Sequence, residues 1–219
     1  MDKPNTRVLF NVPAVLLLGI VIQIAGVYLV DAFCVGVPML GDTVPPLILK
    51  QIEIYNSVIT DLESLEPRMI TYVIFAAPLI EEIVFRVLFF LIFLKFMPFW
   101  AANLLQALLF GIYHGGLVQG TYCFLIGLVI GALFYYTKVG MKKSLIANLD
   151  AFLFGLWLHM VINAAGLYLP PYLPEDLTVS EKISVGCMGV VIILVITTLA
   201  GMWVKGKKIG RVKAAIQKQ

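Results

Sequence analysis

Long stretches without any charged residue constrain this chain more than any other feature of its sequence. From Val8 to Val30 no side chain carries a charge, and a helix needs about 20 apolar residues to cross the hydrocarbon core of a bilayer. Of all 219 residues, 61% are hydrophobic and only 13% are charged, whereas soluble domains carry about 25% charged residues. The composition therefore excludes a soluble enzyme, a disordered chain, a collagen-like chain and a disulfide scaffold. It predicts an all-α, polytopic membrane helix bundle.

About six transmembrane helices are expected from the hydropathy pattern. The first segment is longer than the apolar part of a signal peptide and lacks a small-residue cleavage site, so we expect an uncleaved anchor. We expect residues 1–219 to form a single integral membrane domain, with a basic tail at 205–219. The predicted spans are Val8–Val30, Met69–Leu94, Pro98–Gly116, Tyr122–Thr137, Leu145 or Ala151 to Leu169, and Ile183–Val204.

Charged residues between the predicted spans segregate to two sides of the membrane. With six spans, most acidic loop residues fall on one side. The other side receives Lys3, Arg7, Lys95, Lys138, Lys142, Lys143 and the basic tail. Cations concentrate in cytoplasmic segments, so we expect a multi-pass protein of the cell membrane with both termini in the cytoplasm. Beside a span, the basic tail indicates contact with anionic lipid rather than with nucleic acid.

The long loop after the first span is expected to contain an amphipathic helix. From Ile48 to Leu65, apolar residues recur with helical spacing, while Lys50, Glu53 and Asp61 occupy other positions. Such a helix lies in the lipid interface, which we favour, or it caps the bundle as a gate.

Three ionisable residues lie near the middle of the second predicted span. Glu81, Glu82 and Arg86 each oppose membrane insertion by about 2.5–3.5 kcal/mol, so such residues indicate a functional site. Glu82 and Arg86 stand four residues apart on a helix and can form an ion pair. Glu81 then has no obvious partner in its own helix. Two adjacent carboxylates beside one guanidinium are expected to differ in proton affinity.

Both histidines of the chain also lie in predicted spans. His114 falls in the third span, and His159 shares a helix face with Asn163 in the fifth. Either histidine alone could simply hold helices together by hydrogen bonds. Taken with the charged residues, the set indicates hydrolysis of a carbonyl compound. A Glu and a His can activate water, and a second His with an Asn can donate hydrogen bonds to an oxyanion.

The sequence motifs that mark other classes of hydrolase are absent from this chain. The chain has no GxSxG nucleophile motif and no HExxH zinc motif. The three cysteines, Cys34, Cys123 and Cys187, have no metal-binding or disulfide spacing. Two histidines and a glutamate are zinc ligands by type, so a zinc site stays open as an alternative, although no local spacing supports it.

The polar residues form three motifs that resemble those of a known family. Glu81-Glu82-x-x-x-Arg86, Phe110-x-x-x-His114 and His159-x-x-x-Asn163 are similar to the EExxxR, FxxxH and HxxxN motifs of the CPBP (Abi) family. That family contains the type II CAAX prenyl endopeptidases and bacterial relatives linked to bacteriocin processing and self-immunity. The motifs occur in the family's order, each on its own apolar segment, and the resemblance covers a core of about residues 69–166.

The resemblance implies a metal-independent intramembrane endopeptidase without a cofactor, acting on a membrane-associated or lipidated peptide or protein. Glu81 would activate water with the help of His114, His159 and Asn163 would form the oxyanion hole, and Glu82 and Arg86 would organise the site. Two alternatives remain. One is a non-catalytic scaffold or bacteriocin self-immunity protein. The other is a proton-coupled transporter, since intramembrane Glu and His sets also relay protons, although the sequence shows no internal repeat.

Overall fold

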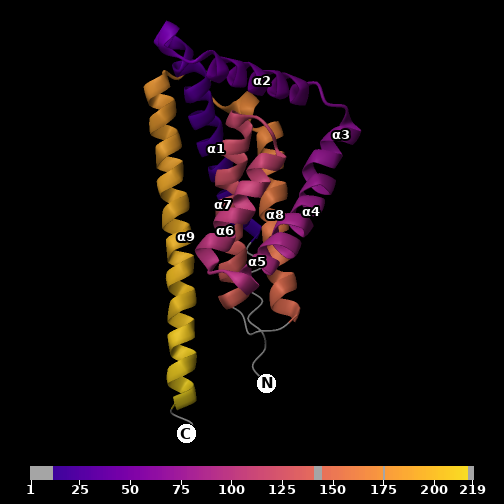
Figure 1. Ribbon diagram of the computed structural model, residues 1–219, viewed down its shortest axis with the longest axis vertical. Coiled ribbons are helices and arrows are strands. Elements are labelled where there is room, and N and C mark those ends of the chain that lie inside the picture. The colour runs from indigo at the N-terminus through magenta and orange to yellow at the C-terminus, as the bar shows by residue number, and fades with distance from the viewer. Residues whose placement is uncertain (1–11, 141–144, 175, 217–219) are drawn as a thin grey trace.

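The predicted all-α architecture is confirmed by the computed structural model (Figure 1). It describes residues 12–140, 145–174 and 176–216, and within these ranges it contains helices and no strand. The start of the first predicted span at Val8 and the cations Lys3, Arg7, Lys142 and Lys143 lie outside the described residues.

Each predicted span coincides with helical structure. The second predicted span is an unbroken succession of α- and π-helical segments over residues 67–96, and the amphipathic segment also forms a helix. The α-helices are α1 (Val12–Gly36), α2 (Pro46–Glu63), α3 (Pro67–Thr71), α4 (Ala77–Glu82), α5 (Leu91–Phe96), α6 (Phe99–Tyr113), α7 (Leu117–Gly140), α8 (Leu145–Tyr168) and α9 (Val179–Ile216).

Four of these helices are long and apolar enough to cross a membrane, namely those that contain Pro13–Gly36, Leu117–Val139, Leu149–Tyr168 and Val179–Gly206. Helix α6 is apolar but has only 15 residues, which corresponds to roughly 22 Å at 1.5 Å per residue. The run over residues 67–96 is divided by two π-helical segments and carries the three ionisable motif residues.

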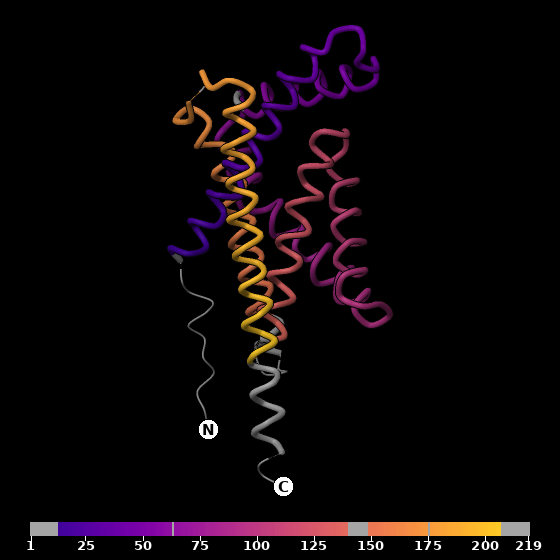
Figure 2. The backbone as a smooth tube through the Cα atoms, turned by 90° about the vertical axis from the view of Figure 1, so that its left-hand side faces the viewer, coloured from indigo at the N-terminus to yellow at the C-terminus, as the bar shows by residue number. Residues whose placement is uncertain are grey.

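The bundle is built around α7 and α8, with α1 and α9 packed side by side along one flank (Figures 1 and 2). Its largest cluster of buried apolar residues joins α1, α7, α8 and α9 and includes Leu18, Ile22, Ile130, Leu158 and Ile193. Helix α9 continues beyond the membrane-length segment to Ile216, so much of the basic tail extends the same helix. Helix α2 lies across one end of the bundle, at a steep angle to the other helices (Figure 1).

Close packing of α6 against α7 depends on two glycines. A Cβ atom on Gly111 would collide with the backbone carbonyl oxygen of Gly120, and a Cβ on Gly120 would meet the carbonyl of Gly111. Small residues allow two membrane helices to approach this closely. The turn between the helices uses Gly115 and Gly116, whose φ angles are +66° and +61°, a conformation that favours glycine. Helix α6 therefore ends before the predicted limit at Gly116.

Candidate active site

Glu81 and Glu82 lie at the end of α4, between the π-helical segments Tyr72–Ala76 and Ile83–Phe90. A π-helix bonds each N–H to the carbonyl five residues earlier, and such wide turns occur frequently at functional sites. In the first segment, the Ala77 N–H donates to the carbonyl of Tyr72. The next donor in this register would be residue 78, which is a proline and has no N–H. The carbonyl of Val73 is thus left without this donor.

Asn163 supplies the missing hydrogen bond from α8. Its amide nitrogen donates to the carbonyl oxygen of Val73 at 2.9 Å. An amide nitrogen carries two hydrogens, so one donor is engaged with the backbone and the second stays available to another acceptor. Asn163, which the sequence analysis assigned to an oxyanion hole, therefore also connects α8 to the wide turn before Glu81.

Glu82 is completely buried and joins two helices. Its Oε1 lies 2.9 Å from Nδ1 of His159, and its Oε2 lies 3.3 Å from Nε of Arg86, which is also fully buried. The predicted pairing of Glu82 with Arg86 across one helical turn is confirmed. The guanidinium carbon of Arg86 lies 4.8 Å above the ring of Phe110 on α6. A Cβ on Gly155 would lie 3.1 Å from Oε2 of Glu82, so this glycine leaves room for the carboxylate.

Glu81 faces both histidines. Its Oε2 lies 3.5 Å from Nε2 of His159 and 3.9 Å from Nε2 of His114. Nδ1 of His114 lies 2.8 Å from the carbonyl oxygen of Phe110. Because a carbonyl only accepts, this nitrogen carries the hydrogen, and Nε2 of the neutral ring is an acceptor. A carboxylate oxygen and an imidazole nitrogen that both accept can hold one water between them through its two O–H groups.

Four of the six residues assigned to the site line one cavity of about 290 Å³, here called the motif cavity. They are Glu81, His114, His159 and Asn163, whereas Glu82 and Arg86 are absent from its described lining. The cavity is covered at one end by α2, which contributes Tyr55, Val58, Ile59 and Leu62. Helix α2 therefore covers this end of the bundle, as in the second of the two arrangements that the sequence left open. The site lies beneath α2, where α4, α6 and α8 converge.

The structure adds polar residues to this cavity that sequence reasoning missed. Gln23 of α1 lines the cavity and accepts a hydrogen bond from the hydroxyl of Tyr122 on α7. The signal for Gln23 was the position of its amide, well inside the predicted first span. Tyr55 of α2 also lines the cavity, and burial raises the pKa of its hydroxyl to about 12. This hydroxyl is therefore a neutral hydrogen-bond donor at physiological pH.

Together, the fold and the buried cluster define an all-α membrane protein with a carboxylate–histidine site enclosed between its helices. The model of a family described as type II CAAX prenyl endopeptidase Rce1-like matches residues 64–165. The matched residues include every named position of the three motifs, and the match confirms the predicted resemblance to the CAAX protease-like CPBP family. This similarity implies an intramembrane protease of the CAAX type. No curated protein and no solved structure matches the chain significantly.

Substitutions of Asn163 are expected to destabilise the protein in a defined order. Asn163→Ala removes the donor to Val73 and should lower the free energy of unfolding by about 1–3 kcal/mol, the cost of an unpaired buried polar group. Asn163→Asp should lower it further, because a carboxylate would face the carbonyl oxygen. Unfolding in mixed micelles, with exposed Asn56→Asp as the control, measures this order. Unchanged stability of both variants would restrict Asn163 to a role in chemistry.

Proposed function

We propose that this protein is a glutamate-dependent intramembrane endopeptidase that hydrolyses a peptide bond of a membrane-associated or lipidated peptide or protein. One observation carries the proposal: Glu81 and the accepting Nε2 of His114 lie 3.9 Å apart in a cavity that also contains His159 and Asn163. The match to a protease family over the same residues supports it.

In the proposed reaction, water held by Glu81 and His114 attacks the carbonyl carbon of the substrate. Glu81 takes one proton from the water as the C–O bond forms, which is the work of a general base. His159 and Asn163 donate hydrogen bonds to the oxyanion. Glu81 then passes the proton to the leaving nitrogen as the C–N bond breaks. The products are a carboxylic acid and an amine.

The pairing of Glu82 determines which hydrogens His159 can offer. Since Nδ1 of His159 donates to Glu82 at 2.9 Å, Nε2 can donate to an oxyanion only when the ring carries hydrogens on both nitrogens. The same contact fixes the orientation of the ring, with Nε2 directed toward Glu81 at 3.5 Å. Glu82 and Arg86 thus organise His159 from outside the motif cavity.

The charge pattern supports a topology for this enzyme. With the basic tail and the N-terminus in the cytoplasm, α2 lies at the opposite face of the cell membrane. The motif cavity, which α2 covers, then lies nearer that face. Among bacterial members of the family, processing or immunity linked to bacteriocins is the role that fits such a peptidase.

Mass spectrometry of membrane-protein N-termini tests the proposed function directly. Host cells that produce the protein are compared with cells that lack it. New N-termini that appear only with the protein support a peptidase and identify its substrate. If a phenotype depends on the protein but no new N-terminus accompanies it, the scaffold or self-immunity alternative replaces the peptidase.

A chelator is expected to leave cleavage by the purified protein unchanged. Nδ1 of His114 is engaged by Phe110, and Glu82 is engaged by Arg86 and His159. Among the described residues, no three His, Cys, Asp or Glu side chains are grouped so that they could hold a metal ion. Cleavage is measured with and without chelator, and a zinc protease serves as the positive control. Inhibition that added zinc reverses would establish the zinc alternative.

A further inference from the structure

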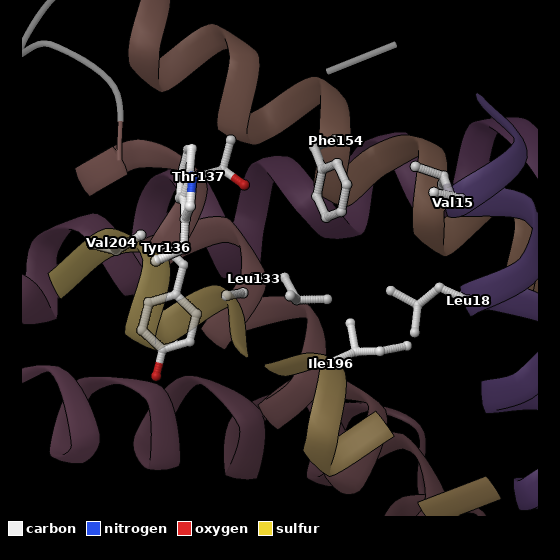
Figure 3. A pocket seen from close by; sticks show the side chains of 11 residues that line it. Val15, Leu18, Leu133, Tyr136, Thr137, Phe154, Ile196 and Val204 are labelled. Carbon is white, nitrogen blue, oxygen red and sulfur yellow. The ribbon is translucent and has the colours of Figure 1, made fainter. Parts of the chain in front are cut away.

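A second cavity, unrelated to the motif residues, lies where α1, α7, α8 and α9 meet. Its volume is about 590 Å³, and no residue of the three motifs is in its described lining. Figure 3 shows apolar side chains from all four helices around it. Those on the inner wall include Val15, Leu18, Leu133, Phe154 and Ala200. We call it the four-helix cavity.

The inner wall of this cavity belongs to the packed core of the bundle. Val15, Leu18 and Leu133 are buried members of the largest apolar cluster, and Phe154 and Ala200 pack against that cluster. A chain that enters the cavity would therefore be held between helices of the protein. Such a position differs from that of lipid that merely surrounds a membrane protein.

One end of the four-helix cavity carries amphipathic side chains. Tyr136, Thr137 and Trp203 contribute to the lining, and Figure 3 shows Tyr136 and Thr137 on the opposite side of the cavity from Val15 and Leu18. Tyrosine and tryptophan concentrate at the level of lipid headgroups. Since these residues lie near the ends of the apolar parts of α7 and α9, this end of the cavity meets the membrane surface.

Cationic residues directly follow the lining residues at this end of the cavity, in α7 and in α9. Lys138 directly follows Thr137 in α7, and Lys205 directly follows Val204, another lining residue, in α9. The basic tail continues beyond Lys205 in the sequence. The acidic residue nearest in sequence to the lining is Asp150, one turn before Phe154 in α8, and the cations outnumber it. The charge at this end favours an anionic group.

We propose that the four-helix cavity is a binding site for one anionic phospholipid of the bilayer. One acyl chain lies in the cavity, and the phosphate group lies at the end formed by Lys138 and Lys205. Transfer of an acyl chain from lipid into an apolar cavity brings little selectivity, because both surroundings are apolar. Selectivity therefore comes from the headgroup, with about a five-fold gain in affinity for each lysine near the membrane surface.

Native mass spectrometry of the full chain from nanodiscs tests this site. The nanodiscs contain equal amounts of phosphatidylglycerol and phosphatidylcholine, and the retained lipids are counted. We expect one retained phosphatidylglycerol in preference to phosphatidylcholine. The double variant Lys138→Gln/Lys205→Gln should lose this preference by roughly ten-fold or more. Lys50→Gln/Lys95→Gln, which removes the same charge elsewhere, should keep it. Equal retention of both lipids by the wild type overturns the proposal.

A substitution that fills the four-helix cavity tests the site sterically, and the same substitution outside the cavity is its control. Ala200 lines the cavity, whereas Met202 on the same helix is 64% exposed and does not line it. Ala200→Phe is expected to lose the retained lipid, and Met202→Phe is expected to keep it. Retention by a folded Ala200→Phe variant equal to that of Met202→Phe would place the lipid elsewhere.

Tryptophan quenching tests the site without altering its lining. Trp100→Phe/Trp157→Phe leaves Trp203 as the single tryptophan, since the chain has three. Phosphatidylglycerol with brominated acyl chains, added as a minor lipid, should quench Trp203 fluorescence several-fold more than brominated phosphatidylcholine at the same mole fraction. Equal quenching by the two lipids contradicts a selective site, even if Ala200→Phe fails to fold.

Discussion

Glu81→Gln is expected to lower the rate of peptide cleavage by about a thousand-fold, while the protein still folds. A positioned general base contributes roughly 10²–10⁴-fold to a rate, and glutamine has the shape of glutamate without its basic oxygen. Glu81 Oε2 lies 3.5 Å and 3.9 Å from the two histidines, so the substitution breaks no short ion pair. Initial rates on the substrate identified from new N-termini measure the effect.

The control for this variant changes a glutamate outside the site. Glu53 of α2 is exposed, and Glu53→Gln should cleave at the wild-type rate. Both variants should show the wild-type unfolding transition in micelles. Full proteolysis by Glu81→Gln would exclude Glu81 as the base. A phenotype that persists in the variant without cleavage would instead support a scaffold.

Arg86→Met is expected to cause the largest loss of stability of any single motif substitution. Glu82 would keep a fully buried charge without its guanidinium partner at 3.3 Å. Removing one partner of a buried ion pair typically costs about 3–5 kcal/mol. Methionine fills much of the volume of arginine, so the loss of stability reflects the missing charge more than an empty cavity. Denaturation in mixed micelles measures the free energy of unfolding.

A double variant separates charge from packing at this position. Glu82→Gln/Arg86→Met removes both charges and should recover much of the lost stability, because no unpaired charge stays buried. It should not recover cleavage, since His159 would lose its carboxylate acceptor. Lys95→Met, at an exposed position on α5, controls for the loss of one cation. A double variant as unstable as Arg86→Met would show that packing dominates.

Much of this arrangement could be predicted from local sequence patterns. Apolar length located the helices, and the four-residue spacing of Glu82 and Arg86 predicted an ion pair that the structure contains. The contact of Glu82 with His159, which lies 77 residues later, depends on how α4 and α8 pack, and no local spacing encodes that packing. The cap formed by α2 and the position of Gln23 in the motif cavity likewise depend on tertiary contacts.

The two π-helical segments make this region tolerant of one particular change in chain length. Each wide turn contains one residue more than an α-helical turn would. Deleting a single residue from Tyr72–Ala76 would allow the segment to close into an α-helix, without a change in any motif residue. Because the wide turn loses only its extra residue, the glutamates would keep their direction relative to α3. A deletion just before the glutamates in α4 would instead rotate them by about 100°, away from the histidines.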